Sequence, residues 1–136
     1  MAEARTLVAG SAEGEPLVLA EPLSFWGGVD PATGDVIDGH HPQAGVNVTG
    51  RVLVMPGGRG SSSSSSSLAE AIRAGTAPAA IVLLEADPIL ALGAIVAREL
   101  YGRTIPIVVA PDPPEAPGGR RLRVDAGRDR AQLVIV

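Results

Sequence analysis

The sequence predicts an α/β fold, in which a central β-α-β-α-β unit is flanked on both sides by further strands. Three apolar runs of the buried-strand type, Arg51–Met55, Ala79–Leu84 and Ile105–Ala110, alternate with segments 63–74 and 88–100, whose apolar residues recur at helical spacing. The chain has 136 residues, 46% of them hydrophobic and 19% charged, which indicates one globular domain with a real core.

The N-terminal part predicts strands and a loop. Two short apolar runs, Thr6–Ala9 and Pro16–Ala20, are expected to be strands joined by a turn at Gly10–Gly14. Residues 24–34 form a punctuated loop that holds the single Phe and the single Trp of the chain. Trp26 is interpreted either as a cap on one end of the core or as a functional residue. Residues 35–38 predict one more short strand.

The C-terminal part predicts a second helix and three strands. Pro88 suits the first turn of the helix 88–100, and Pro111–Gly119, with its four prolines, reads as a surface connection. Arg121–Asp125 alternates like an exposed edge strand, and Ala131–Val136 reads as the last strand. No internal repeat is evident.

Composition excludes several classes of function. The net charge of −4 and the lack of a basic cluster argue against a nucleic-acid partner. No apolar run reaches the roughly 18–20 residues that span a bilayer, and no signal peptide is visible, so a soluble cytoplasmic protein is expected. Without cysteine, the chain can form no disulfide and cannot hold a cysteine-ligated zinc or iron–sulfur centre.

Two pairs of polar residues could be interpreted as functional sites, but the sequence favours a structural interpretation of each pair. Adjacent side chains in an extended segment point in different directions, so His40 and His41 are expected to be solvent-exposed polar residues rather than ligands of one metal. Glu85 and Asp87 follow a predicted strand and precede Pro88. We expect them to be acids at the start of a helix, where they match its dipole.

A glycine turn followed by a serine run, Gly57–Gly60 and then Ser61–Ser67, lies between a predicted strand and a predicted helix. This arrangement presents backbone N–H groups and hydroxyls to an anion. Alternatively, the glycines only turn the chain, one serine caps the helix and the others fill its first turns. Ser63 breaks the dinucleotide-binding fingerprint, a P-loop would need a lysine that the chain lacks, and the G-x-S-x-G spacing of many hydrolases is missing.

Several segments together resemble one known family, and they occur in the family's order. The chain is similar to the small subunit, or swivelling domain, of the aconitase X family, and the resemblance covers about residues 10–110 of a domain taken as 1–136. It implies a compact swivelling β/β/α domain. The matching segments are Glu21–Pro31, Gly50–Met55, Gly58–Ser62, Gly75–Ala80 and Gly93–Ala97.

The resemblance implies a dehydratase, a hydro-lyase, and assigns roles around the glycine turn. Ser61 corresponds to the serine that acts as base, and Arg59, Gly60 and Ser62 are expected to bind substrate. Related aconitases commonly follow this serine with an arginine that holds a substrate carboxylate. Here Ser62 and Ser63 follow instead, which leaves open whether Arg59 takes over that role and whether Ser61 or Ser62 is the base.

A serine hydroxyl is a weak base unless its environment stabilises the alkoxide. The helix N-terminus, the glycine N–H groups and Arg59 would supply positive potential beside Ser61. A helix turns Ser65 and Ser66 away from the glycine turn, so their replacement is expected to matter little for turnover.

The resemblance also implies a cofactor and a partner. An iron–sulfur cluster or iron is expected on a large catalytic subunit, so that this chain alone binds no iron and is inactive. The substrate expected is cis-3-hydroxy-L-proline, weakly favoured by an arginine-only set of basic residues and by Trp26. The alternatives are the small subunit of a mevalonate 5-phosphate dehydratase and a non-catalytic binding or structural domain.

Overall fold

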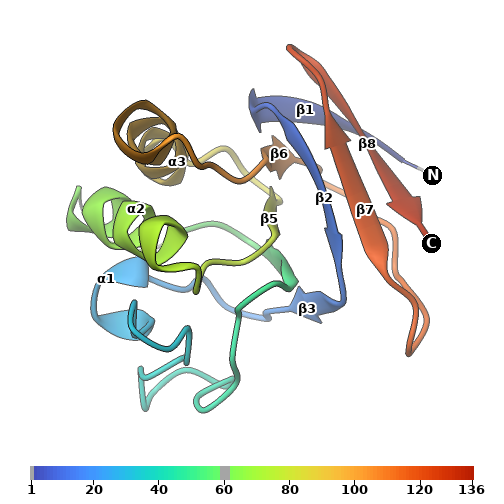
Figure 1. Cartoon of the computed structure of the whole chain (residues 1–136). Coiled ribbons are helices and arrows are strands. Elements are labelled where there is room, and N and C mark those ends of the chain that lie inside the picture. Colours follow the sequence, from blue (N-terminus) through green and yellow to red (C-terminus); the bar gives the residue numbers. More distant parts are fainter. Residues whose placement is uncertain (1, 59–61) are drawn as a thin grey trace.

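The computed structural model describes residues 2–58 and 62–136, and it contains an eight-stranded sheet with two long helices beside it (Figure 1). The helices are α1 (Phe25–Gly28), α2 (Ser63–Ala74) and α3 (Pro88–Tyr101). The strands are β1 (Ala2–Val8), β2 (Gly10–Gly14), β3 (Pro16–Val18), β4 (Val52–Met55), β5 (Ala80–Leu83), β6 (Ile107–Val109), β7 (Leu122–Ala126) and β8 (Arg130–Ile135).

The sheet has a parallel half and an antiparallel half. Its strand order is β2-β7-β8-β1-β6-β5-β4-β3. Strands β3, β4, β5 and β6 pair in parallel, and α2 and α3 are the crossovers between β4, β5 and β6. Strands β2, β7, β8 and β1 pair antiparallel, and β1 joins the two halves through β6. The confirmed fold is therefore a mixed α/β domain around the β-α-β-α-β unit that the sequence predicts.

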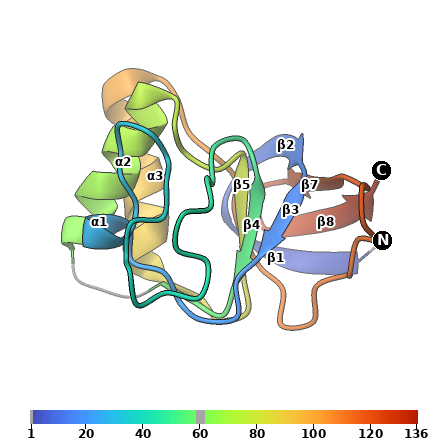
Figure 2. The same cartoon turned by 90° about the horizontal axis from the view of Figure 1, so that it is seen from below.

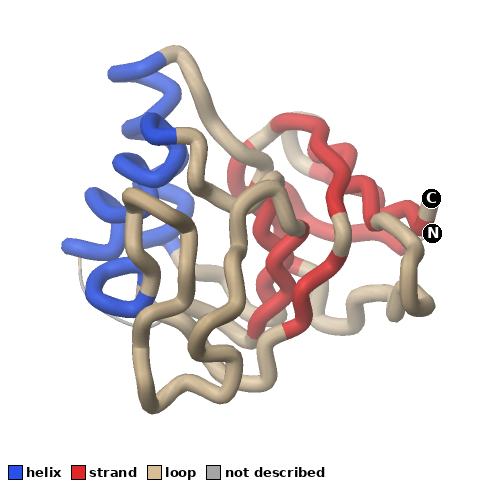
Figure 3. The backbone as a smooth tube through the Cα atoms, turned by 60° about the horizontal axis from the view of Figure 1, so that its bottom comes forward, coloured by secondary structure: helices blue, strands red, loops and turns tan. Residues whose placement is uncertain are grey.

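Two apolar cores lie on the two faces of the parallel strands. One core packs Leu53, Ile81 and Ile107 against buried side chains of α2 and α3. The other packs alternate residues of the same strands, such as Val54 and Val82, against the antiparallel strands. Figures 2 and 3 show the helices on one side of β4 and β5 and the antiparallel strands on the other. Burial on both faces explains why these short strands read as unbroken apolar runs.

The predicted central elements are confirmed within one or two residues. The helix predicted at 63–74 is α2, so Ser63 to Ser67 are helical and Ser62 is the N-cap; the described part of the serine run is not a linker. The helix predicted at 88–100 is α3, with Pro88 at its first position. Both long helices end at a glycine with positive φ, Gly75 and Gly102, as C-terminal caps commonly do.

Two predictions about the flanking strands are wrong. The segment Gly10–Gly14, expected as a turn, is β2 and pairs with β7 along its whole length. Its small and polar residues give no apolar pattern, so the pairing with β7 defines the strand. Strand β7 itself is not an exposed edge, because it lies between β2 and β8 and buries Leu122 and Val124.

Residues 24–51 form a long connection that packs beside α2. Within it, α1 is a single distorted turn, with non-helical angles at Trp26 and a φ of 76° at Gly27. The strand predicted at 35–38 is reduced to isolated bridges, in which Val36 pairs with Val29 and Asp35 with Asn47. None of the helices in the described ranges is long and apolar enough to cross a bilayer.

Candidate functional site

The candidate site lies where the chain leaves β4 and enters α2. Arg59, Gly60 and Ser61, the predicted catalytic and substrate-binding residues, fall outside the described residues. Ser62, the fourth predicted residue, is described and exposed, and it stands at the N-cap of α2. Its side chain makes no capping hydrogen bond with the described part of the helix, so its hydroxyl is not used to cap α2.

Gly58 stands at the start of this loop, and neighbouring atoms pack closely against it on two sides. Its backbone forms a parallel bridge with Leu23. A Cβ at Gly58 would collide with the Oδ2 atom of Asp87 and come within 3.1 Å of the Cδ1 atom of Leu90. A side chain larger than hydrogen therefore does not fit at residue 58 unless the carboxylate of Asp87 moves.

The turns that follow β4 and β5 are joined by backbone hydrogen bonds. Leu84 N–H donates to the carbonyl of Met55 and Glu85 N–H donates to the carbonyl of Pro56, each at 3.2 Å. Both turns lie at the carboxyl ends of parallel strands, the usual place of ligand sites in α/β sheets. The loop that leads to α2 therefore starts where the turns after β4 and β5 are hydrogen-bonded to each other.

Asp87 caps α3, as the sequence predicts. Its Oδ1 atom accepts hydrogen bonds from the backbone N–H groups of Ile89 at 2.9 Å and Leu90 at 3.3 Å. Glu85 is exposed and lies in the preceding turn. The contact between Asp87 and Gly58 links the start of α3 to the start of the candidate site, a link that sequence spacing does not reveal.

The N-terminal half of α2 is held tightly against α3. The Ser65 hydroxyl donates to the carbonyl of Ile89 at 2.6 Å, and Ser65 is buried. A Cβ at Gly93 would approach the Ser65 carbonyl oxygen to 2.7 Å, so glycine permits this close contact of the two helices. The Ser65 hydroxyl is therefore bound within the contact between α2 and α3, which gives Ser65 a structural role.

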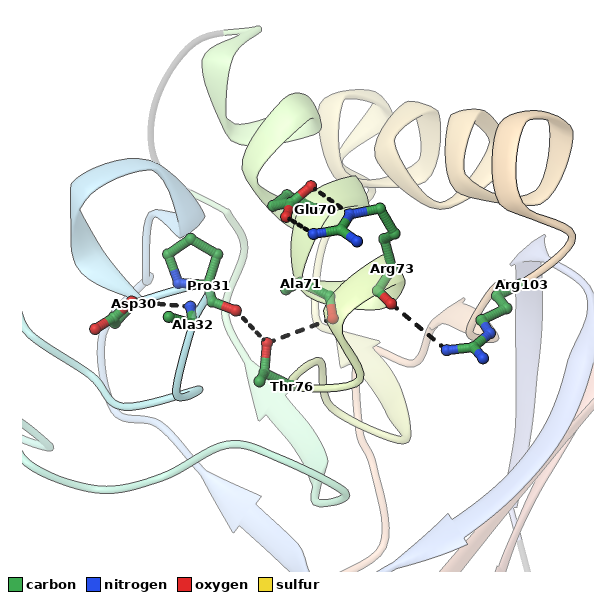
Figure 4. Close-up of polar contacts among 8 residues, drawn as sticks. All are labelled: Asp30, Pro31, Ala32, Glu70, Ala71, Arg73, Thr76 and Arg103. Carbon is green, nitrogen blue, oxygen red and sulfur yellow. Dashed lines mark hydrogen bonds and ion pairs between the residues drawn. The ribbon is translucent and has the colours of Figure 1, made fainter.

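Residues 24–34, the loop that contains the single Phe and Trp, contact α2 near both of its ends. The hydroxyls of Ser24 and Ser64 lie 3.2 Å apart, and Ser64 is buried. At the far end of α2, the Thr76 hydroxyl donates to the carbonyl of Pro31 at 2.7 Å (Figure 4). These bonds fix α2, and with it the serine-bearing N-terminus, against residues 24–31.

Trp26 does not cap the core. Phe25 fills that place with a relative exposure of 1%, whereas the Trp26 side chain is 64% exposed. Of the two interpretations of Trp26, the cap on the core is therefore wrong, and α1, which contains Trp26, lies next to α2 (Figure 1).

The two histidines differ in their surroundings. His40 is exposed, as expected, but His41 is buried, with a relative exposure of 5%. Its Nδ1 atom accepts from the backbone N–H of Gln43 at 3.0 Å, so the ring proton is on Nε2, which lies 3.3 Å from the carbonyl oxygen of Glu21. The expectation of an exposed His41 is wrong, because these contacts satisfy both ring nitrogens inside the loop.

The charged residues of α2, Glu70 and Arg73, form an ordinary ion pair on the surface. Glu70 accepts a hydrogen bond from Arg73 Nε at 2.9 Å, which lowers the pKa of the Glu70 carboxyl and raises the pKa of Arg73 (Figure 4). Both groups are solvent-exposed, so water screens the pair.

The donor set of this chain does not fit an iron cluster. The sequence has no cysteine, and the described residues contain no group of three or more His, Asp or Glu side chains that could hold a metal ion. Cluster ligation depends chiefly on cysteine thiolates. An iron group serving this site would need ligands from another protein region.

Comparison with known proteins places the chain in one family. A model of the aconitase X swivel domain matches residues 1–133. The chain belongs to that family. The aconitase X of Thermococcus kodakaraensis, solved in its holo-form, superposes with a TM-score of 0.83 at 37% identity, covering 98% of this chain and 99% of that one.

Sequence relatives fall into two named groups. A cis-3-hydroxy-L-proline dehydratase of Pseudomonas aeruginosa is 63% identical over 103 residues, which are 76% of this chain and 18% of that protein. A phosphomevalonate dehydratase small subunit of Pyrococcus furiosus is 39% identical over 130 residues, covering 96% of this chain and 92% of the subunit. This chain therefore spans about a fifth of the longer relative and nearly all of the shorter one.

Proposed function

We propose that this chain is the small, swivelling subunit of an aconitase X-type dehydratase, and that residues 1–136 together form its swivelling domain. The observation that carries this proposal is the 63% identity to a cis-3-hydroxy-L-proline dehydratase across the segment that contains most of the chain. The geometry supports it, because Gly58 and α2, on either side of the glycine–serine loop in the sequence, are both packed against the rest of the domain, and the described residues contain no group that could hold a metal ion.

In this proposal Ser61 is the base that removes a proton from carbon. Gly58, which is bridged to Leu23, and Ser62, the N-cap of α2, flank residues 59–61 in the sequence, so the N-terminus of α2 is the helix end that follows Ser61 along the chain. The positive end of the helix dipole and the nearby backbone N–H groups favour an alkoxide or a substrate anion there. Arg59 and the N–H of Gly60 would add to that field, and Ser62 would contact the substrate.

The lack of cysteine supports the proposal that a large subunit holds the iron group. A dehydration removes a proton and a hydroxide, and the leaving hydroxide needs an electrophile. Because cysteine is absent from the sequence, the iron–sulfur cluster or iron would be bound by the large subunit. The complex would work in the cytoplasm without nucleic acid or membrane as partner, and the small subunit alone would be inactive.

The favoured substrate is cis-3-hydroxy-L-proline. In this molecule the carboxylate-bearing carbon carries the proton to be removed, and the neighbouring carbon carries the hydroxyl. The second candidate, mevalonate 5-phosphate, is also a β-hydroxy acid, and the match along 92% of a phosphomevalonate dehydratase small subunit supports it. The hydroxyproline relative is 63% identical over 103 residues, whereas phosphomevalonate dehydratase small subunits are 50% identical over 95 residues and 55% over 83 residues, so identity favours the proline substrate.

The test is reconstitution. The chain is mixed, under anaerobic conditions and with iron, with the aconitase X large subunit of the same organism, and each substrate is supplied in turn. We expect dehydration of cis-3-hydroxy-L-proline by the mixture and by neither chain alone. Turnover by this chain alone would refute the shared site. Turnover of mevalonate 5-phosphate in place of the proline would refute the substrate assignment and keep the reaction class.

A further inference from the structure

The outer face of α3 is apolar where a surface helix is normally polar. From Pro88 to Ala97 the helix contains no charged or polar side chain. Leu92 is 50% exposed, and Ile95 and Val96 are only partly buried. A helix that covers one side of a sheet usually turns charged residues to water on its outer face. The outer face of α3 has the composition of a contact surface instead.

Leu92 forms a ridge between two hollows. One hollow, of about 320 Å³, is lined by Ser62, Ser63, Ser65 and Ser66 of α2 and its N-cap together with Leu92 and Val96. The other, of about 440 Å³, lies on the opposite side of Leu92, where Pro88, Ala91 and Ile95 meet Leu7 and Arg5 of β1. We call the surface formed by Pro88, Ala91, Leu92, Ile95 and Val96 the α3 face.

The α3 face continues without charge onto the candidate site. The α2 segment from Ser63 to Ala69 also lacks charged side chains, and the first charge along α2 is Glu70. Ser62 lines the first hollow and belongs to the predicted substrate-binding residues. Helices α2 and α3 lie side by side (Figures 1 and 2), and the first hollow joins their uncharged segments, from Ser62 to Val96.

We propose that the α3 face is the surface on which the iron-bearing large subunit docks, with Leu92 as its central anchor. This proposal rests on the proposed function. In the Pseudomonas aeruginosa relative the matched segment is only 18% of the protein, so in that protein the counterpart of this chain is joined to a much longer region. A partner that covers the serine loop also covers its neighbouring surface, which here is the α3 face.

The position of the face argues against a second copy of this chain as the occupant. In a symmetric dimer the same patch of each copy meets the other, so docking through Leu92 would place the two serine hollows against each other. Both candidate sites would then be closed to the large subunit. A different protein, which brings the missing half of the site, uses the same surface without this conflict.

Leu92 and Leu100 offer a matched test on one helix. Both are exposed leucines, at 50% and 67%, but Leu100 lies beside the charged residues Arg98 and Glu99, and it lines neither hollow. Leu92→Asp should raise the Kd for the large subunit at least about 30-fold, as expected when a charge replaces a central anchor. Leu100→Asp should change the Kd less than about threefold.

The measurement is calorimetric titration of the large subunit with each variant, after thermal unfolding has shown that both variants fold. As a check without substitution, amide hydrogen exchange across α3 in the wild-type chain should slow when the large subunit is added. Equal weakening by both substitutions, no weakening by Leu92→Asp, or unchanged exchange in α3 would each overturn the docking proposal. So would a wild-type self-dimer that Leu92→Asp dissociates, because the face would then serve a second copy.

Binding and turnover separate this inference from the proposed function. A wild-type complex that forms through Leu92 but dehydrates neither substrate would contradict the proposed reaction and leave the docking surface supported. An active complex that Leu92→Asp does not weaken would contradict the docking surface alone. Failure of the wild-type chain to bind the large subunit would overturn both.

Discussion

Replacing Gly58 by alanine should loosen both the start of α3 and the loop that carries Ser61. The added Cβ would occupy the place of the Asp87 Oδ2 atom. The carboxylate must then move, and its hydrogen bonds to the N–H groups of Ile89 and Leu90 weaken. Losing an N-cap costs about 0.5–2 kcal/mol and forcing an extra carbon into a packed site about 1–3 kcal/mol.

We therefore expect Gly58→Ala to lower the free energy of unfolding by about 2–4 kcal/mol. For a chain of this size that corresponds to a fall in Tm of roughly 6–15 °C. Gly57→Ala is the matched control, because a Cβ at Gly57 meets nothing within 4 Å. It should change stability by less than about 1 kcal/mol. Circular dichroism during thermal and urea unfolding measures both variants.

A double-mutant cycle identifies the cause. If the collision with Asp87 is responsible, Gly58→Ala in an Asp87→Ala background should cost no more than about 1 kcal/mol, since the carboxylate is already gone. The reasoning is refuted if Gly58→Ala is as stable as Gly57→Ala, or if its cost is the same in both backgrounds.

Three further outcomes are expected, each measured by unfolding of the purified chain. Ser65→Ala should lower the free energy of unfolding by about 1 kcal/mol, because it removes the hydrogen bond to the Ile89 carbonyl. Ser66→Ala, at an exposed position, should leave it unchanged, and equal effects of the two substitutions would contradict this. His41→Ala should lose about 1–3 kcal/mol through its two backbone contacts, and no loss would show that water replaces them. Trp26→Ala should change stability by less than about 0.5 kcal/mol, and a larger loss would mean that the indole is packed.

The sequence predicts the central elements well for a physical reason. Strands β4, β5 and β6 are buried on both faces, so they must be apolar throughout, and the two helices between them carry clear apolar spacing. Strand β2 is missed because Gly-Ser-Ala-Glu-Gly becomes a strand by pairing with β7, more than a hundred residues away. Burial of His41 likewise depends on loop contacts that local pattern cannot show.

For the candidate site, the sequence predicts the loop and the cap but not what holds them. Asp87 as a helix-start acid follows from its position before Pro88. Its contact with Gly58, and the bond between Ser24 and Ser64, join segments separated by 29 and 40 residues. Nothing in the spacing of residue types indicates these contacts, because they arise from the parallel pairing of β3, β4 and β5, which brings together the segments that follow these strands.

The central claim is that this chain contributes a serine base to a site shared with a large subunit. Its most direct test is turnover of cis-3-hydroxy-L-proline by the reconstituted, iron-loaded complex containing Ser61→Ala, Ser62→Ala or the control Ser66→Ala. Ser61→Ala should lower kcat by roughly 10²- to 10⁴-fold or more while the complex still forms, and Ser66→Ala should be normal. If turnover is lost with Ser62→Ala and kept with Ser61→Ala, the base is Ser62 rather than Ser61. Near-normal turnover by both the Ser61 and the Ser62 variants, in assembled complexes, would contradict the serine-base account.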